Sequence, residues 1–385
     1  MRVVVIGAGL GGLCLAQGLL RAGVEVAVYE RDAAISARFQ GYRIGLAEQG
    51  ESALRDCLPE RLHPLLTATM GDLEGARPVL DHRLNPVGDL GPAAATAIDR
   101  QVLRQLLAAG LGPHLRFGRE FTDYRVRPDS RVSVSFSDGT ETVADLLVGA
   151  DGVNSAVRGR LSPETRPFDT GVRFVVGRTP LDERFAKLVP GFGTVIKTPE
   201  LTLMLGLMKF REPPKRAAAR YAPEVVLSDT ADYLRWVTMP GSPKPLAELM
   251  AGWHPELRAV VKATDAVQSA ELSIRVVRPG ARWPAGPVTL LGDAIHATSP
   301  SGGNGANTAL HDANLLRRKL TEVLHGRLDL TAALSAYERD MFDYGTTAVD
   351  HSLQALPAFT PQRTVGARIG TLPGSQEARS LPSSG

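Results

Sequence analysis

Glycines near the start of the chain have the spacing of a phosphate-binding turn. Gly7, Gly9 and Gly12 stand at the first, third and sixth positions of one short segment. The first glycine permits a tight turn, the second lets the backbone approach a pyrophosphate, and the third lets a helix pack closely on a strand. Glu30 lies roughly 20 residues further on, where a carboxylate can accept hydrogen bonds from a ribose. We predict a dinucleotide site rather than a ligand-free turn, with the candidate residues Gly7, Gly9, Leu10, Gly11, Gly12, Glu30 and Arg31.

Glu30 suits either NAD or the adenosine half of FAD, so it does not identify the dinucleotide. A second segment of the sequence distinguishes the two. Gly292 and Asp293 follow the apolar run 288–291, where a carboxylate can bind a polyol chain. A glycine-rich loop comes next, and then a helix whose N-terminal partial positive charge would stabilise a reduced, anionic flavin. This segment favours FAD, and it adds the candidates Asp293, Pro300, Gly303, Gly305, Ala306 and Asn307.

His296 adjoins this segment and could be a base, but a packed structural role is the favoured interpretation. No Ser-His-Asp or Cys-His arrangement stands out in the sequence. We therefore predict no catalytic side chain.

Short apolar strands must position these residues. The runs Val3–Ile6 and Ala144–Ala150 are of the kind buried in parallel sheets, and the helix expected from about Gly11 to Arg21 leads into a strand that ends at Glu30. From about residue 171 to residue 276, strand patterns dominate. The sequence predicts an α/β fold: a Rossmann-like FAD-binding domain with a parallel sheet, an inserted antiparallel-sheet substrate domain, and C-terminal helices.

The first domain is expected to be discontinuous in sequence, because apolar strand and helix patterns return after residue 276. The tail is expected to be loosely ordered, because it is rich in Pro, Gly and Ser. The expected ranges are 1–67, 95–165 and 277–328 for the FAD-binding domain, 68–94 and 166–276 for the substrate domain, 329–356 for a C-terminal helix and 357–385 for the tail.

From Met1 to about Leu356, the order of motifs resembles the class A single-component flavoprotein monooxygenases, the para-hydroxybenzoate hydroxylase-like aromatic hydroxylases. The glycine segment with Glu30, the pair Asp151-Gly152, and the pair Gly292-Asp293 carry this resemblance.

The resemblance implies roles for three further residues. Asp151 would serve FAD and NAD(P)H together, although an aspartate there could instead cap the following helix. Arg100, which opens a helix, would contact the FAD pyrophosphate or ribityl chain. Arg43 would lie near the flavin; a salt bridge is the alternative for this side chain.

The resemblance also implies FAD as cofactor, NADPH or NADH as co-substrate, and O2. Oxygen would pass through a flavin C4a-hydroperoxide to an aromatic or polycyclic small molecule. Epoxidation and Baeyer-Villiger insertion use the same motifs. A FAD-dependent reductase or dehydrogenase without oxygen transfer, or a flavoprotein kept as a binding partner, stays open as well. Met204, Met208 and Phe210 alternate along Leu201–Phe210 and could line the substrate site, but core packing is the stronger interpretation.

Composition argues against several other classes. The formal net charge is +3 and no long Lys/Arg run occurs, so nucleic acid is not an expected partner. Cys14 and Cys57 are the two cysteines, and neither is spaced as a metal ligand. The glycines within Val3–Leu20 argue against a membrane segment. We expect a cytoplasmic enzyme that is a monomer or homodimer.

Overall fold

A five-stranded parallel sheet forms the centre of the first domain in the computed structural model, which describes residues 1–37 and 41–361. Its strand order is β18-β12-β1-β2-β8, and every neighbouring pair is parallel. Val3, Val4 and Val5 have no exposed surface, as expected of a strand that is covered on both faces. The strands are β1 (Arg2–Ile6), β2 (Glu25–Tyr29), β8 (Leu115–Arg116), β12 (Leu146–Gly149) and β18 (Val288–Leu290).

Two three-stranded antiparallel sheets flank the parallel one. In the first, β7 (Ala93–Asp99) lies between β3 (Arg43–Leu46) and β4 (Met70–Gly75). In the second, β10 (Val132–Phe136) lies between β9 (Phe121–Val126) and β11 (Glu141–Ala144). The first of these sheets faces the substrate domain through β7 and β15 (Leu201–Met208).

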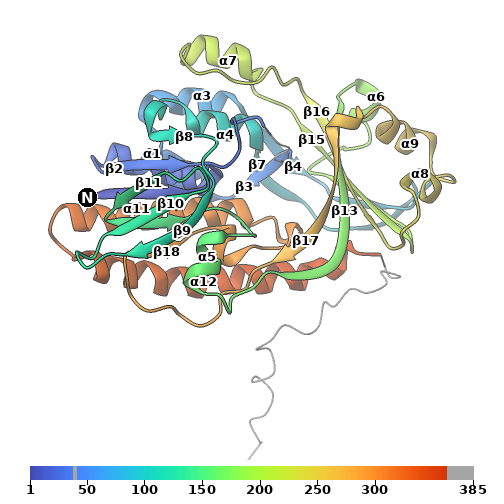
Figure 1. Ribbon diagram of the computed structural model, residues 1–385. Helices are drawn as coiled ribbons and strands as arrows, with labels where there is room; N and C mark the ends of the chain where they lie inside the picture. The colour runs from blue at the N-terminus through green and yellow to red at the C-terminus, as the bar shows by residue number, and fades with distance from the viewer. Residues whose placement is uncertain (38–40, 362–385) are drawn as a thin grey trace, which may run out of the picture.

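A seven-stranded sheet makes up most of the remainder, on the right of Figure 1. Its order is β17-β13-β16-β15-β14-β5-β6, and its pairs are antiparallel except β14 with β5, which is parallel. The sheet that the sequence predicts to be antiparallel therefore contains one parallel pair of strands. The remaining strands are β5 (Pro78–Leu80), β6 (Pro86–Asp89), β13 (Phe168–Pro180), β14 (Thr194–Lys197), β16 (Tyr233–Pro240) and β17 (Ser269–Val276).

Helices cover the sheets. Phe185, Leu257 and Val260 pack against Trp236 on the outer face of the large sheet. The helices are α1 (Leu10–Arg21), α2 (Glu48–Cys57), α3 (His63–Ala68), α4 (Arg100–Ala108), α5 (Ala156–Leu161), α6 (Glu183–Ala186), α7 (Pro214–Tyr221), α8 (Leu246–Leu249), α9 (Pro255–Lys262), α10 (Asp293–His296), α11 (Gly305–Leu324) and α12 (Leu330–Phe359).

The long helix α12 runs beneath both domains in Figure 1. The predicted end at residue 356 is wrong by three residues, because the helix continues through Pro357 to Phe359. A proline in the last turn removes only one backbone hydrogen bond, and packing of Leu353 and Leu356 against Val276 holds this end in place. Residues 362–385, most of the predicted tail, lie outside the described part of the chain.

The predicted fold class is confirmed, whereas the domain boundaries stay a prediction. Leu201–Phe210 was expected to be one strand, but β15 ends at Met208. Met208 and Phe210 are buried in the main hydrophobic cluster, and Met204 is partly exposed beside that cluster.

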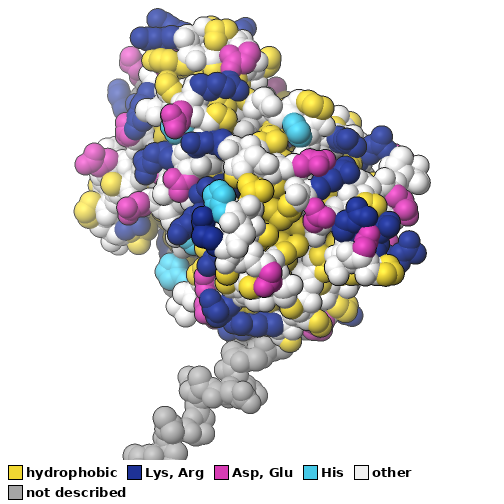
Figure 2. Space-filling model, turned by 90° about the vertical axis from the view of Figure 1, so that its left-hand side faces the viewer, with side chains coloured by type: hydrophobic (Ala, Val, Ile, Leu, Met, Phe, Trp, Pro, Cys, Tyr) yellow, Lys and Arg dark blue, Asp and Glu magenta, His cyan; other side chains and the backbone are white. Residues whose placement is uncertain are grey.

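Figure 2 shows one face of the molecule, on which basic side chains are interspersed with acidic ones. Within residues 1–37 and 41–361, no helix is long and apolar enough to cross a membrane. In the same residues, no group of His, Cys, Asp and Glu has the arrangement of a metal site.

Candidate functional site

The glycine segment forms a tight turn between β1 and α1. Gly7 has φ of +105°, a left-handed conformation that favours glycine, and its N–H donates to Tyr29 at 2.8 Å. A Cβ atom on Gly12 would lie 2.2 Å from the carbonyl oxygen of Gly7. A Cβ on Gly11 would lie 2.7 Å from Leu291. These three glycines are therefore required by the fold itself.

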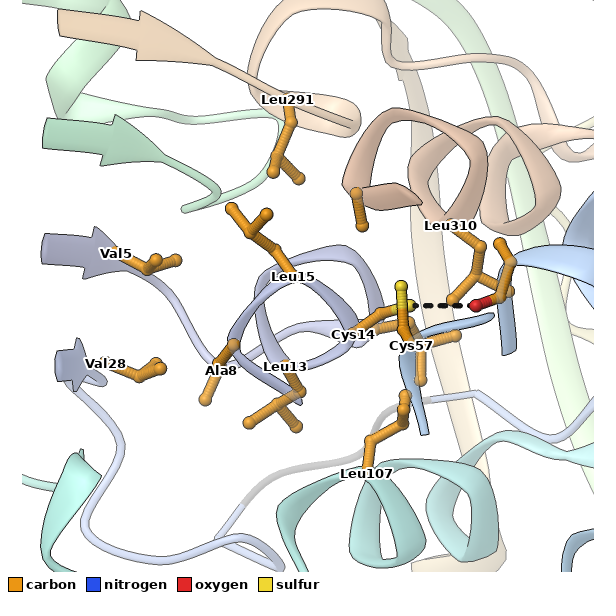
Figure 3. Close-up of a cluster of buried hydrophobic side chains, with 14 of the residues drawn as sticks. Val5, Ala8, Leu13, Cys14, Leu15, Val28, Cys57, Leu107, Leu291 and Leu310 are labelled. Carbon is orange, nitrogen blue, oxygen red and sulfur yellow. Dashed lines mark hydrogen bonds between the residues drawn. The ribbon is translucent and has the colours of Figure 1, made fainter. Parts of the chain in front are cut away.

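Gly9 differs from its neighbours because space is open in front of it. Its φ of −74° suits any residue, and a Cβ atom there would meet nothing nearer than 4.0 Å. Leu10, the first residue of α1, is buried. Figure 3 shows α1 held between Val5 and Val28 of the sheet and Leu107 and Leu310 of the neighbouring helices. The helix is thus fixed, while the turn at Gly9 can be approached by a ligand.

Glu30 follows β2 and is only 4% exposed. One carboxylate oxygen accepts the N–H of Ala8 at 2.8 Å, and the other accepts the N–H of Asp32 at 3.0 Å. Arg104 lies 3.5 Å from Glu30 and donates to the Ala8 carbonyl at 2.8 Å. Glu30 is therefore tied to the glycine turn from both sides, and the next residue, Arg31, is exposed.

Asp293 and Arg100 are nearly 200 residues apart in sequence and close in space. Gly292 has φ of +61° and turns the chain into α10, which begins at Asp293. Burial by the surrounding protein raises the pKa of the Asp293 carboxyl, while the positive charges of Arg100 and His296 oppose this rise. The Asp293 side chain is nevertheless exposed to solvent, so a ligand can reach the carboxylate.

The N-terminus of α11 lies beside Asp293. A Cβ on Gly305 would be 3.8 Å from a carboxylate oxygen of Asp293. Among the described residues, the backbone N–H groups of Gly305, Ala306 and Asn307 have no hydrogen-bond acceptor. Such N–H groups, at the positive end of a 20-residue helix, favour an electron-rich ligand atom.

The side chain of Asn307 is already used within the protein. Its Oδ1 accepts the N–H of Ala47 at 2.9 Å, and its Nδ2 donates to the Gly45 carbonyl at 3.0 Å. Asn307 therefore joins α11 to β3. The preceding loop is a single 3-10 turn, Pro300–Gly302, closed by Gly303 with φ of +66°.

His296 is fully buried, and its Nε2 lies 2.7 Å from Asp312. The same carboxylate oxygen of Asp312 accepts the N–H of Gly292 at 2.6 Å, and the other accepts the Tyr344 hydroxyl. This network fixes the turn before Asp293, which fits a structural role for His296.

The side chain of Asp151 accepts hydrogen bonds at the start of helix α5, as a capping residue does. Its Oδ1 accepts the Ser155 hydroxyl at 2.5 Å and its Oδ2 accepts the N–H of Ala156 at 2.7 Å, at the start of α5. A contact between Asp151 and FAD stays a prediction.

Arg43 reaches the substrate domain. Its guanidinium donates to the Leu207 carbonyl at 2.7 Å, and a Cβ on Gly206 would lie 2.8 Å from it. The contact of Arg43 with the substrate domain is thus a hydrogen bond to a carbonyl, and a contact between Arg43 and the flavin stays a prediction.

The site fits FAD, because three separate features would accept different parts of it. Space at Gly9 suits a pyrophosphate, the exposed carboxylate of Asp293 suits the ribityl hydroxyls, and the unbonded N–H groups of α11 suit the flavin ring. A separate surface cavity of about 290 Å³, lined by residues such as Gln105 and Val226, contains none of the predicted site residues.

Sequence reasoning assigned no role to Arg104 or to Asp312. Arg104 interrupts the apolar positions Leu103, Leu106 and Leu107 of one helix, and this is the signal that could have found it. Asp312 lies in α11 between His311 and Ala313, and the sequence gives no comparable signal for it.

Comparison with known proteins identifies a family. The family described as "FAD binding domain" matches residues 1–352. A 6-hydroxynicotinate 3-monooxygenase of Bordetella bronchiseptica is 31% identical, over 88% of this chain and 86% of its own length. A dual O-methyltransferase/FAD-dependent monooxygenase of Cercospora beticola is 30% identical over 88% of this chain. The chain spans only 44% of that relative's length.

A solved structure is similar to this chain in both sequence and fold. A crystal structure of a protein from Photorhabdus luminescens subsp. laumondii, described as an FAD-containing monooxygenase, is 31% identical with a TM-score of 0.80. The match covers 94% of this chain and 98% of that one.

Proposed function

The chain belongs to the family of FAD binding domains, and from this premise we propose that it is an FAD-dependent monooxygenase. It uses NAD(P)H and O2 to hydroxylate an aromatic or polycyclic small molecule. The observation that carries the proposal is the convergence of Arg100, Asp293 and the open N-terminus of α11 at one place, from segments far apart in sequence.

Each part of the site has a task in holding the cofactor. Gly9 lets the pyrophosphate approach the start of α1, and Glu30 accepts a hydrogen bond from the adenosine ribose. Asp293 binds the ribityl chain beside Arg100. The first N–H groups of α11 would stabilise negative charge on the flavin ring.

When bound, FAD supplies hydride acceptance from NAD(P)H and the activation of O2. The chain's own contribution would be to orient the ring, to stabilise negative charge on it, and to keep water away from it. The proposal requires no protein nucleophile, and it leaves His296 in its hydrogen bond to Asp312.

The substrate proposal is supported by relatives as well as by geometry. The Bordetella relative is named for action on 6-hydroxynicotinate, a heteroaromatic ring. In this chain, Met204 is partly exposed on the sheet that faces the FAD-binding domain and offers an apolar surface to a ring.

The test is NADPH or NADH oxidation by the purified flavoprotein, with ¹⁸O₂, in the presence and absence of a panel of phenolic, heteroaromatic and polycyclic compounds. Stimulated oxidation with ¹⁸O in the product is the expected result. Stimulated oxidation with no labelled product would instead identify a reductase.

We propose a cytoplasmic location, where NAD(P)H is available, and a monomer or homodimer. Cell fractionation and light scattering of the purified protein test these two points.

A further inference from the structure

A cleft of about 450 Å³ opens on the surface where α1, α2 and α11 pack together. Four of the side chains that line it belong to the arginines Arg21, Arg55, Arg317 and Arg318. The acidic residues of the lining are Asp56 and Glu60. Counting histidine as neutral, the lining therefore has an excess of two positive charges, although the net charge of the whole chain is only +3.

The cleft lies far from the candidate FAD site, although it is built from the same helices. Near the start of both helices, a Cβ on Gly11 of α1 would lie 3.0 Å from the carbonyl oxygen of Ala309 in α11. Further along, a Cβ on Gly18 would lie 2.5 Å from Cδ of Arg317, so the two helices run in the same direction. Arg21 is the last residue of the 12-residue α1, roughly 16 Å along the helix from the glycine turn. A ligand in the cleft would therefore be separate from FAD.

Two of the four arginines are held in place by neutral oxygen atoms. Arg21 donates from Nη1 to the carbonyls of Asp56 at 3.0 Å and Leu58 at 2.8 Å, at the C-terminal end of α2. Arg317 donates from Nε and Nη2 to Oδ1 of Asn314, at 3.0 Å and 2.7 Å. These bonds orient the guanidinium groups without cancelling their charge. Less side-chain entropy is then lost when a ligand binds to them.

The other two arginines keep donors that the protein does not use. Within the described part of the chain, Arg318 is exposed and makes neither a hydrogen bond nor an ion pair. Arg55 is 3.8 Å from Glu51, one turn earlier in α2, and a long ion pair on a helix surface contributes little. Glu60 pairs with Arg21, at 3.5 Å, and so does not neutralise either of them. The guanidinium groups of Arg55 and Arg318 therefore remain available to a ligand.

A phosphate group fits these donors better than a carboxylate does. Its dianion matches the excess of two positive charges in the cleft. Its oxygen atoms are arranged tetrahedrally, so they can accept hydrogen bonds from guanidinium groups that approach from different helices. A concave surface with an excess of one charge also concentrates ions of the opposite charge. The volume of the cleft lies within the range of small-molecule sites, so it has room for more than the phosphate itself.

We propose that the cleft between α1, α2 and α11 is a second ligand site, which binds the phosphate group of a small molecule through Arg55, Arg317 and Arg318. Arg21 contributes by holding the end of α2 that carries Arg55. The proposal does not depend on the monooxygenase reaction, because the site is separate from that of FAD. Inorganic phosphate and a phosphate ester share the chemistry that the cleft recognises.

The first experiment is a calorimetric titration of the FAD-bound protein with inorganic phosphate, ribose 5-phosphate and AMP at constant ionic strength. We expect at least one of these probes to bind at one saturable site per chain. The double variant Arg55→Gln/Arg318→Gln should weaken this binding at least about tenfold. The matched control is Arg125→Gln/Arg173→Gln, which removes the same charge from two exposed arginines on β9 and β13 and should bind normally.

Two results would overturn the proposal. One is the absence of saturable binding by all three probes in the wild type. The other is an equal loss of affinity in the control pair, which would mean that phosphate is attracted only by the overall charge of the surface. Arg318→Gln alone breaks no contact within the described residues, so it tests the site without a loss of folding, and it should weaken binding about threefold or more.

The order of affinities identifies the source of the phosphate group, because bound FAD already fills the adenosine site. Equal affinity for the three probes indicates inorganic phosphate as the ligand, whereas tighter binding of AMP indicates a nucleotide.

The second experiment places the anion directly. Crystals of the FAD-bound protein are soaked in sodium tungstate, a tetrahedral dianion, and measured at a tungsten absorption edge. We expect an anomalous peak within contact distance of the guanidinium groups of Arg317 and Arg318. The peak should persist in the control pair and disappear in Arg55→Gln/Arg318→Gln. Tungstate peaks that occur only outside the cleft would contradict the proposal.

Discussion

The imidazole Nε2 of His296 lies 2.7 Å from Oδ2 of Asp312, and neither residue has appreciable exposure to solvent. Burial alone lowers the pKa of this histidine. The charge of Asp312, their hydrogen bond and the nearby Asp293 outweigh burial and raise it above its usual value. Because Asp312 also accepts the N–H of Gly292, the protonation of His296 is coupled to the turn that presents Asp293.

The first prediction concerns pH. A raised folded-state pKa means that this pair stabilises the protein fully below about pH 6.5, the unfolded value, and that the contribution is lost as pH rises through the folded value. We expect the free energy of unfolding to fall more between pH 6 and pH 9 in the wild type than in His296→Gln, measured by urea denaturation at saturating FAD. If the free energy of unfolding changes with pH by the same amount in the two proteins, His296 stays neutral.

The second prediction separates two glycines of one turn. Gly9→Ala should change the stability of the FAD-free protein by no more than about 1 kcal/mol, because the methyl group enters open space. It should weaken FAD about tenfold or more by obstructing the pyrophosphate. Gly12→Ala should instead lower stability by about 3 kcal/mol, because its methyl group overlaps the Gly7 carbonyl. Thermal unfolding measures the stability of both variants, and FAD titration measures their affinity for the cofactor. If Gly9→Ala binds FAD as tightly as the wild type, the pyrophosphate does not bind at this turn.

The third prediction tests the ribose contact of Glu30. Glu30→Gln keeps the size of the side chain and loses its charge, so FAD should bind about tenfold more weakly. Glu25→Gln, at the exposed start of β2, the strand that precedes Glu30, is the matched control and should bind FAD normally. Fluorescence titration of apoprotein with FAD measures both. If Glu30→Gln and the wild type bind FAD with equal affinity, Glu30 only holds the glycine turn in place and does not contact the ribose.

The fourth prediction concerns Arg104. Arg104→Met leaves the buried carboxylate of Glu30 without its cation, and we expect a loss of about 3–5 kcal/mol of stability. Arg104→Lys should restore only part of it, because the single nitrogen of a lysine cannot reproduce the planar fork in which Nε, Nη1 and Nη2 of the arginine face Ala8, Ile35 and Glu30 separately. Denaturant unfolding measures the stability of the two variants and the wild type. If Arg104→Lys is as stable as the wild type, the positive charge alone accounts for the stabilisation by Arg104.

Much of the FAD-binding domain could be predicted from the sequence, because its strands are buried on both faces. Such strands must be apolar, and the glycines that end them are needed by local backbone geometry. Gly7 is an example, since the turn itself requires its φ of +105°, and Gly12 faces the carbonyl oxygen of Gly7 in the same turn.

The role of Arg104 could not be predicted in this way. Its place among the apolar positions of α4 marks it as unusual, but its partners Glu30 and Ala8 are more distant in sequence than any local pattern reaches. The end of α12 was mispredicted for a related reason, since distant packing outweighs the local effect of Pro357.

The position of β18 in the sheet has a consequence for biosynthesis. It borders β12, next to β1, yet Val288 leaves the ribosome long after Ile6. At ~5–20 residues per second, this separation corresponds to roughly 15–60 s. During that interval the nascent chain has its glycine turn but neither Asp293 nor α11, so FAD cannot yet be held at the flavin end. Cofactor capture is thus a late event in synthesis, and an exposed edge of the parallel sheet needs protection until then.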